Sequence, residues 1–257
     1  MAFPLSYSTL HWQTPDLEND LGALVEKGWD GWESRQSLDW LGSAKRVKSI
    51  CKSVGIGISA ICGPNATLDT TSEAHEMTKR KIEFAADLEV PLFMTKGPGR
   101  MGLPTPARDE DLDRMAVAYE DLATFGESLG VTVTFHPHIN HLVDSANEFQ
   151  RFMTRLSKCR LCLDMSHLVL WGMDPIQAVH DYADEIAYVH LHDYKDDTPS
   201  DLGDGPMCNF GAFMRALEEI GYSDWITVCP GNTNRTEAEQ MHVNRTYLKN
   251  LGYLGCG

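Results

Sequence analysis

The chain has 257 residues, 42% of them hydrophobic, and a formal net charge of −15 at pH 7. The acidic excess disfavours a nucleic-acid partner, because binding to a phosphate backbone depends on basic residues, and favours a small-molecule partner. The sequence contains no run of about 18 apolar residues, and its first residues lack the pattern of a secretory signal. We therefore expect no membrane span and a cytoplasmic protein.

Strand-like and helix-like segments alternate along the whole chain. The expected strands are residues 5–10, a short segment that ends at Glu33, and residues 55–62, 90–95, 131–135, 161–164, 186–190 and 225–228. The expected helices are residues 14–28, a segment that ends at Val54, and residues 72–87, 109–130, 145–156, 174–182, 210–220 and 237–251. Strict alternation predicts a parallel (β/α)8 TIM barrel of the α/β class. The length is typical of one such barrel, so we expect a single domain over residues 1–257.

Two local patterns add detail to these elements. Thr14, Pro15 and Asp16 have the order of a helix cap, a proline at the first helical position and an acid in the first turn. The longest stretch without a predicted element is GPGRMGLPTP, residues 97–106. Long loops in compact domains are usually functional or mobile, so this loop is a candidate lid.

The seven cysteines are scattered and odd in number, which favours reduced thiols over a disulfide framework. Cys159 and Cys162 have the CxxC spacing of some redox and zinc sites. They enter a predicted strand, however, and side chains in a strand alternate between its faces. We therefore expect these two sulfurs to be separated.

The ends of three consecutive predicted strands carry residues that bind metals in many proteins. His136 and His138 end the fifth strand, Asp164 ends the sixth within LCLDMSH, and His190 and His192 end the seventh. In (β/α)8 barrels the catalytic groups lie at the carboxyl ends of the strands. The alternative interpretation of Asp164 is that it caps the next helical turn.

A fourth donor, Cys229, follows the eighth predicted strand. Together His136, Asp164, His190 and Cys229 offer nitrogen, oxygen and sulfur atoms suited to a divalent transition metal. Because they come from four strands, they could converge on the barrel axis. Each also has an ordinary explanation, as a hydrogen-bonded buried histidine or, for Cys229, a small core residue.

Several segments resemble consecutive motifs of the sugar-phosphate isomerase and epimerase group, the xylose isomerase-like barrels. They are FHPHINH, LDMSH followed by LVLWGMDP, YVHLHDYK, and LGDGPMCNF leading to GYSDWITV. The HPH, DxxH and VHLxD segments are most similar to inosose dehydratase and its relatives. The likeness covers about residues 131–252, and GWDGWE, which ends at Glu33, is the best match in the N-terminal half.

The resemblance implies a metal site built from glutamate, aspartate, histidine and glutamate on strands five to eight. Asp164 and His190 match the aspartate and the histidine, and His167 matches a substrate-contacting histidine. His136 and Cys229 stand where the two glutamates are expected. In the isomerases and epimerases those glutamates also move the proton, so their absence disfavours reversible proton transfer between two bases.

We therefore predict a metal-dependent lyase, a dehydratase of a polyhydroxylated carbonyl compound such as a keto-cyclitol or keto-sugar. It would act by α-proton abstraction and a metal-stabilised enolate, with Mn, Co, Zn or Fe as the divalent metal. The candidates for proton transfer are His138, His167, His192, Glu33 and Lys96. The candidates for substrate contact are His11, Trp12, His167 and Lys96.

Three alternatives remain at this stage. The first is an isomerase or epimerase of a sugar or sugar phosphate, and the second is a non-catalytic barrel with a degenerate metal site. The third, a nuclease resembling endonuclease IV, is disfavoured by the acidic charge and the missing glutamates. Assembly into a homo-oligomer stays open.

Overall fold

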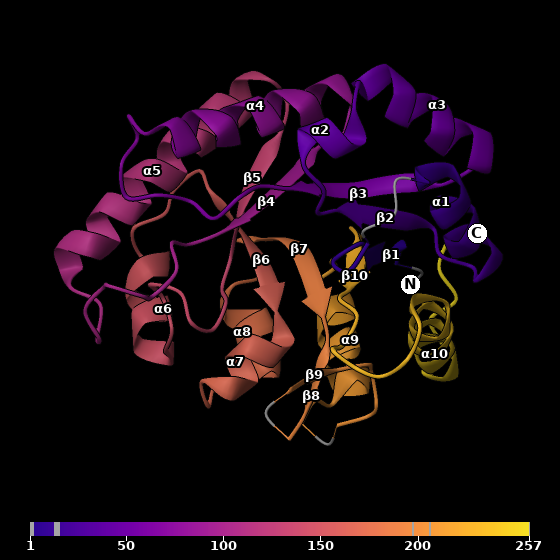
Figure 1. Cartoon of the computed structure of the whole chain (residues 1–257). Helices are drawn as coiled ribbons and strands as arrows, with labels where there is room; N and C mark the ends of the chain where they lie inside the picture. The colour runs from indigo at the N-terminus through magenta and orange to yellow at the C-terminus, as the bar shows by residue number, and fades with distance from the viewer. Residues whose placement is uncertain (1–2, 13–15, 197, 206, 257) are drawn as a thin grey trace.

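Eight parallel strands close into a barrel in the order β1-β10-β7-β6-β5-β4-β3-β2, with helices packed around it (Figure 1). The structure is a computed structural model that describes residues 3–12, 16–196, 198–205 and 207–256. The barrel strands are β1 Leu5–Ser8, β2 Gly31–Ser34, β3 Gly57–Cys62, β4 Leu92–Lys96, β5 Thr132–His136, β6 Arg160–Asp164, β7 Ile186–Leu191 and β10 Ile226–Val228. The predicted (β/α)8 barrel is confirmed.

The helices of the described residues cover the outside of the barrel. They are α1 Leu17–Glu26, α2 Leu38–Leu41, α3 Ala44–Val54, α4 Glu73–Asp87, α5 Asp109–Ser128, α6 Ala146–Met153, α7 Met165–Leu170, α8 Pro175–Asp181, α9 Phe210–Glu219 and α10 Glu237–Asn250. None of these helices combines the length and apolar character needed to cross a membrane. The short helices α2 and α7 were not predicted, because one or two turns carry too little periodicity to be recognised.

A small antiparallel hairpin, β8 Asp193–Lys195 and β9 Thr198–Ser200, projects beyond the end of β7 and was also not predicted. The start of α1 differs from the expectation as well. Asp16 is the N-cap, accepting a hydrogen bond from the backbone N–H of Asn19, and does not lie in the first turn. Thr14 and Pro15, the predicted cap and first helical residue, lie outside the described residues.

The barrel interior contains a chain of hydrogen-bonded hydroxyl groups. Ser6 Oγ lies 2.6 Å from Ser59 Oγ, and Ser59 Oγ lies 3.0 Å from Tyr188 Oη. Tyr188 Oη lies 2.6 Å from Thr227 Oγ1 and donates to Glu33 Oε2 at 3.0 Å. The chain thus leads from the middle of the barrel to a buried carboxylate near its carboxyl end.

Cys159 and Cys162 belong to different parts of the core, as expected from strand alternation. Cys162 packs inside the barrel in a small apolar cluster with Met94 and Tyr188. Cys159 is part of the larger cluster between the barrel and its helices.

The loop between β4 and α5, predicted as a candidate lid, is hydrogen-bonded to the body of the protein. Glu148 of α6 is 1% exposed and accepts hydrogen bonds from Arg100 Nη2 at 2.7 and 2.9 Å and from Ala107 N at 2.6 Å. It also accepts one from Asp144 N at 2.8 Å. One buried carboxylate therefore holds both the β4–α5 and the β5–α6 loops.

Replacing this carboxylate should weaken the fold. We expect Glu148→Gln to lower the free energy of unfolding at pH 7 by about 2 to 4 kcal/mol, because a buried ion pair loses one charge. Burial alone would raise the pKa of Glu148, but Arg100 and the backbone N–H groups hold it below its usual value. The carboxylate's contribution is therefore present above the unfolded-state pKa of about 4.3 and disappears as the pH falls through the folded-state pKa.

Urea unfolding of both proteins between pH 7 and pH 3 tests this, and the difference between them should shrink below about pH 4.3. Glu110→Gln is the matched control, because Glu110 has a side chain that is 83% exposed. It should change the free energy of unfolding by less than about 0.5 kcal/mol. A Glu148→Gln protein as stable as the parent at pH 7 would contradict the assignment.

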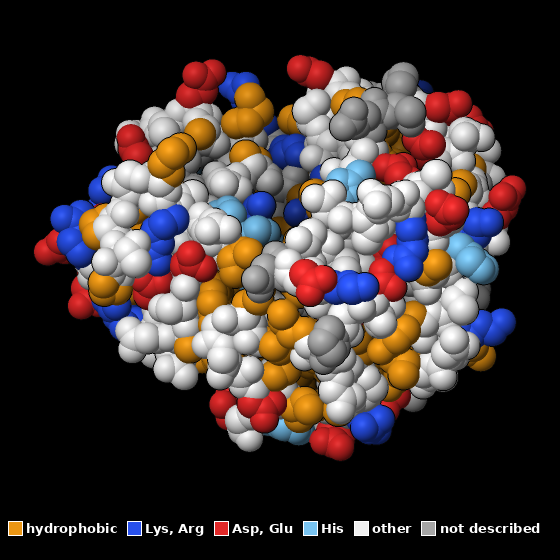
Figure 2. Space-filling model, turned by 60° about the horizontal axis from the view of Figure 1, so that its bottom comes forward, with side chains coloured by type: hydrophobic (Ala, Val, Ile, Leu, Met, Phe, Trp, Pro, Cys, Tyr) orange, Lys and Arg blue, Asp and Glu red, His pale blue; other side chains and the backbone are white. Residues whose placement is uncertain are grey.

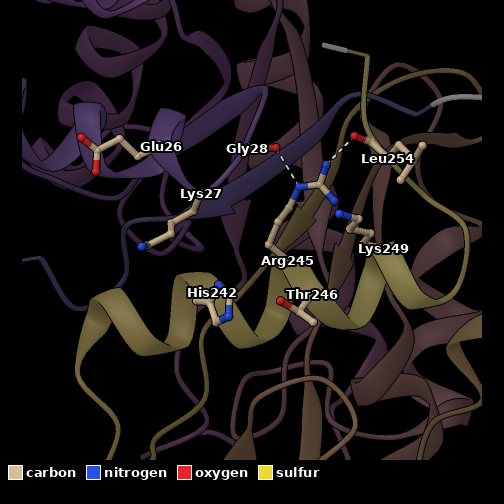
Figure 3. Close-up of a pocket in the computed structure, with 8 residues that line it drawn as sticks. All are labelled: Glu26, Lys27, Gly28, His242, Arg245, Thr246, Lys249 and Leu254. Carbon is tan, nitrogen blue, oxygen red and sulfur yellow. Dashed lines mark hydrogen bonds between the residues drawn. The ribbon is translucent and has the colours of Figure 1, made fainter.

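A basic cavity lies between α1 and α10, away from the predicted site residues (Figure 3). Its volume is about 510 Å³. Arg245 of α10 lies beside Lys249 and donates hydrogen bonds to the carbonyl oxygens of Gly28 and Leu254, which joins α10 to two chain segments. Of the residues predicted to act in catalysis or metal binding, none lines the described part of this cavity.

Candidate active site

A second cavity, of about 220 Å³, lies at the carboxyl ends of the barrel strands. Its lining consists of Leu10, Arg35, Lys96, His136, His138, Ile139, Asn140, Asp164, His167, His192, Tyr194, Pro199, Cys229 and Pro230. The strand register aligns Lys96 with His136 and Asp164 with His190, so the end of β4 is level with that of β5, and the end of β6 with that of β7. Figure 2 shows histidine and Lys or Arg side chains together in the central hollow of this face.

Asp164 is the centre of a buried histidine cluster. Its carboxylate lies 3.1 Å from His136 Nε2, 3.1 Å from His192 Nε2 and 3.8 Å from His167 Nε2. It also accepts hydrogen bonds from the backbone N–H groups of Ser166 at 3.0 Å and His167 at 3.3 Å, as the N-cap of α7. Both interpretations of Asp164 from the sequence therefore apply, because it caps α7 and also projects into the cavity.

The surroundings of Asp164 keep it ionised, and its charge determines which ring nitrogens of the neighbouring histidines carry hydrogen. Burial alone would raise the pKa of Asp164, but the adjacent His192 and His167 hold it well below its usual value. The group is a carboxylate and can only accept, so the ring nitrogens of His136 and His192 that face it carry hydrogens. Burial holds the pKa of His136 well below its usual value and lowers that of His167 to about 3, so both rings are neutral at pH 7.

Glu33 lies beneath the cavity in a second buried cluster. Its carboxylate accepts from Arg35 Nε at 2.8 Å and from Ser8 Oγ at 2.7 Å, and lies 2.5 Å from His190 Nε2. Burial alone would raise the pKa of Glu33, but the charges of Arg35 and His190 hold it well below its usual value. Cys229 Sγ lies 3.6 Å from both His190 Nδ1 and Arg35 Nη2.

His138 has the arrangement of a neutral base. Its Nδ1 lies 2.8 Å from the carbonyl oxygen of Ile139, which can only accept, so Nδ1 carries the ring hydrogen and Nε2 carries a lone pair. Burial, with the nearby His167 and His136 rings, lowers the pKa of His138, so the ring is neutral at pH 7. The rings of His138, His167 and His192 form a row, with centroid separations of 4.3 and 4.9 Å.

Among the described residues the donor atoms form three overlapping groups that could hold a divalent metal: His136 with Asp164 and His190, Glu33 with His190 and Cys229, and Asp164 with His167 and His192. Within the described residues, His136, Asp164 and His190 each offer a ligand atom, and these atoms lie within 4.8 Å of one another. His136 Nδ1 is buried and has no hydrogen-bond partner among the described residues, although a neutral ring with hydrogen on Nε2 needs one. Cys229 groups instead with Glu33 and His190.

The structure brings most of the predicted site residues together. His136, His138, Asp164, His167, His192, Lys96 and Cys229 line the cavity, and Glu33 and His190 lie directly behind it. His11 and Trp12 do not line it. His11 is exposed, and Trp12 stacks on Trp32 with ring centroids 6.3 Å apart. Strand β1 ends at Ser8, earlier than predicted. Leu10, in the loop that follows, lines the cavity instead of His11 and Trp12.

Of the lining residues that the sequence analysis did not predict, Arg35 and Tyr194 carry polar groups next to the predicted ones. Arg35 lies two positions after Glu33 and directly beyond β2, which ends at Ser34, so strand alternation does not identify it. Tyr194 belongs to β8, a strand that was not predicted. The ring centroids of Tyr194 and His192 are 5.2 Å apart.

Comparison with known proteins gives one family and several relatives. The model of the family described as xylose isomerase-like TIM barrel matches residues 21–251. An inosose dehydratase of Lacticaseibacillus casei is 30% identical over 141 residues, covering 47% of this chain and 47% of that protein. An inosose dehydratase of Geobacillus kaustophilus (strain HTA426) is 32% identical over 141 residues, covering 47% and 46%. The chain spans about half the length of these curated relatives.

Several solved structures that are similar in fold are sugar epimerases. The apo form of 3-keto-D-glucoside 4-epimerase from E. coli has a TM-score of 0.80 at 19% identity, covering 97% of this chain and 99% of that chain. A D-psicose 3-epimerase from Clostridium cellulolyticum H10 has a TM-score of 0.81 at 16% identity, covering 99% and 100%. At such identities the likeness concerns the fold. The relatives and structural neighbours are enzymes, and their names refer to small sugar-like compounds.

Proposed function

Because the chain belongs to the xylose isomerase-like TIM barrel family, we propose that it is a metal-dependent dehydratase of a polyhydroxylated carbonyl compound, such as a keto-cyclitol or keto-sugar. The observation that carries this proposal is the make-up of the cavity. Asp164 is the one acidic side chain in the described lining, which also includes four histidines. The general acid and base of this cavity are therefore histidines. The similarity to inosose dehydratases supports a reaction that eliminates water.

We assign the metal to His136, Asp164 and His190, and His190, which is charged beside Glu33, would release a ring proton on binding it. Nitrogen and oxygen donors of this kind bind Mn, Co, Zn or Fe, and His136 Nδ1 is a buried nitrogen that lacks another partner among the described residues. When bound, the metal would polarise the substrate's carbonyl oxygen. We leave Cys229 out of the set, because its sulfur contacts Arg35 and His190.

The residues of the cavity supply the remaining chemistry. His138 Nε2, the lone-pair nitrogen, takes the proton from the carbon next to the carbonyl group. His192 is held through Nε2 by Asp164 and, as the imidazolium ion, delivers the hydrogen of its other nitrogen to the hydroxyl group, which leaves from the adjacent carbon as water. His138 is then protonated and His192 neutral, and exchange with solvent restores both rings. His167 lies between these two rings and is placed to bind a substrate hydroxyl group.

Turnover in deuterated water tests the reaction. The metal-loaded protein should convert one member of a panel of keto-cyclitols and keto-sugars into a product lighter by one water, measured by mass spectrometry. Deuterium incorporation at unchanged composition would instead identify an isomerase or epimerase. Stoichiometric metal binding without any conversion across the panel would support the non-catalytic alternative and contradict the proposal.

A further inference from the structure

The cavity lining includes two cations, of which Arg35 is paired with Glu33 and Lys96 has no ion-pair partner among the described residues. Arg35 and Lys96 line the cavity, and Lys81 of α4 lies behind them, 7% exposed. The Lys81 ammonium donates to the carbonyl oxygens of Gln36 at 2.7 Å and Cys62 at 2.6 Å. We call Arg35, Lys81 and Lys96 the cationic wall.

The carboxylates near this wall are already engaged. Glu33 is paired with Arg35 and His190, and Asp164 faces the histidine cluster. Lys96 Nζ has no hydrogen-bond or ion-pair partner among the described residues. Arg35 uses Nε for Glu33 and Ser8 and Nη2 for Cys229, which leaves Nη1 without a described partner.

Lys96 thus stands without a counter-ion in the cavity lining of an acidic protein. Burial and the charge of Arg35 both lower the pKa of Lys96, which means that the ammonium is destabilised where it stands. A ligand anion between Lys96 and Arg35 would relieve this repulsion and use donors that are otherwise unpaired. The opposite side of the same cavity carries His138, His167 and His192, the proposed proton-transfer groups.

From this arrangement we infer that the substrate carries an anionic group, a carboxylate or a phosphate, which binds to Lys96 and Arg35 Nη1. The polyhydroxylated carbonyl part then faces the histidines and Asp164. The inference rests on the proposed function for the choice of a polyol framework. It adds that a neutral keto-cyclitol or keto-sugar is a poorer ligand than its acidic counterpart.

Calorimetric titration with unreactive polyols tests the inference without turnover. The probes are glucitol (neutral), gluconate (carboxylate) and glucitol 6-phosphate (phosphate). At least one anion should bind about tenfold or more tightly than glucitol, as a charge-assisted hydrogen bond provides. The preferred anion identifies the group. Lys96→Gln should abolish the preference, and Lys96→Arg, which keeps the charge, should retain most of it.

Lys249→Gln is the control, because Lys249 is an exposed lysine of the other basic cavity. It should leave the preference unchanged. Equal affinity for all three probes, or a preference that survives Lys96→Gln, would overturn the inference. An intact anion preference with no dehydration would refute the proposed function alone, whereas dehydration of a neutral substrate unaffected by Lys96→Gln would refute the inference alone.

Discussion

Asp164→Asn should lower the affinity for a divalent metal by at least about 100-fold and abolish turnover, while the barrel stays folded. The amide retains an oxygen that can accept the backbone N–H groups of Ser166 and His167, so α7 keeps its cap. It loses the negative charge and directs an N–H group at the histidine cluster. Metal analysis after dialysis, together with circular dichroism, measures the two effects separately.

Asp174→Asn is a closely matched control. Asp174 caps α8 through Ile176 N at 2.9 Å and Gln177 N at 3.3 Å, nearly the distances of the Asp164 cap, but it lies at the protein surface. This variant should bind metal and turn over substrate like the parent. Full metal content in purified Asp164→Asn would show that Asp164 is a helix cap and nothing more.

His138→Gln should reduce turnover by about 100- to 10,000-fold with unchanged metal content, because it removes the proposed base. The glutamine side chain can still donate to the carbonyl oxygen of Ile139, so the local backbone is supported. Exchange of substrate hydrogen with deuterated water should stop as well, which separates a lost base from weaker substrate binding. The measurement is single-turnover kinetics at saturating substrate.

His141→Gln provides the comparison for this variant. His141 Nδ1 lies 2.8 Å from the same carbonyl oxygen, and the His141 and His138 ring centroids are 4.7 Å apart. His141 is not among the described residues that line the cavity, so its replacement should change turnover less than about tenfold. Comparable losses in both variants would assign the effect to the loop and not to a base.

The barrel and the cluster at its carboxyl end could be predicted because both depend on local patterns. Apolar strands alternate with helices, and donor residues stand where β5, β6 and β7 stop. Parallel strands in register bring such ends to one level, as the pairs Lys96 with His136 and Asp164 with His190 confirm. The proton positions of His138 and His136 depend on contacts to a carbonyl oxygen and a carboxylate, which no sequence spacing specifies.

Irregular backbone accounts for most of what could not be predicted. The pairing of β2 with β3 shifts after Trp32 and Ile58, so that Glu33 pairs with Ala60 and Ser59 has no partner across the ladder. Such a bulge redirects side chains in a way that simple alternation does not describe. At this bulge Ser59 and Glu33 are both buried inside the barrel. Arg35, two residues after Glu33, lines the cavity above them.

The hydroxyl chain inside the barrel gives Glu33 a form of internal solvation. Tyr188 donates its single hydroxyl hydrogen to the carboxylate, so its oxygen can only accept from Ser59 and Thr227. The O–H dipole next to Glu33 is therefore held pointing at the negative charge, as in the first water shell around an anion. Rotation of O–H bonds is left to the hydroxyl groups farther from the carboxylate, those of Ser6, Ser59 and Thr227.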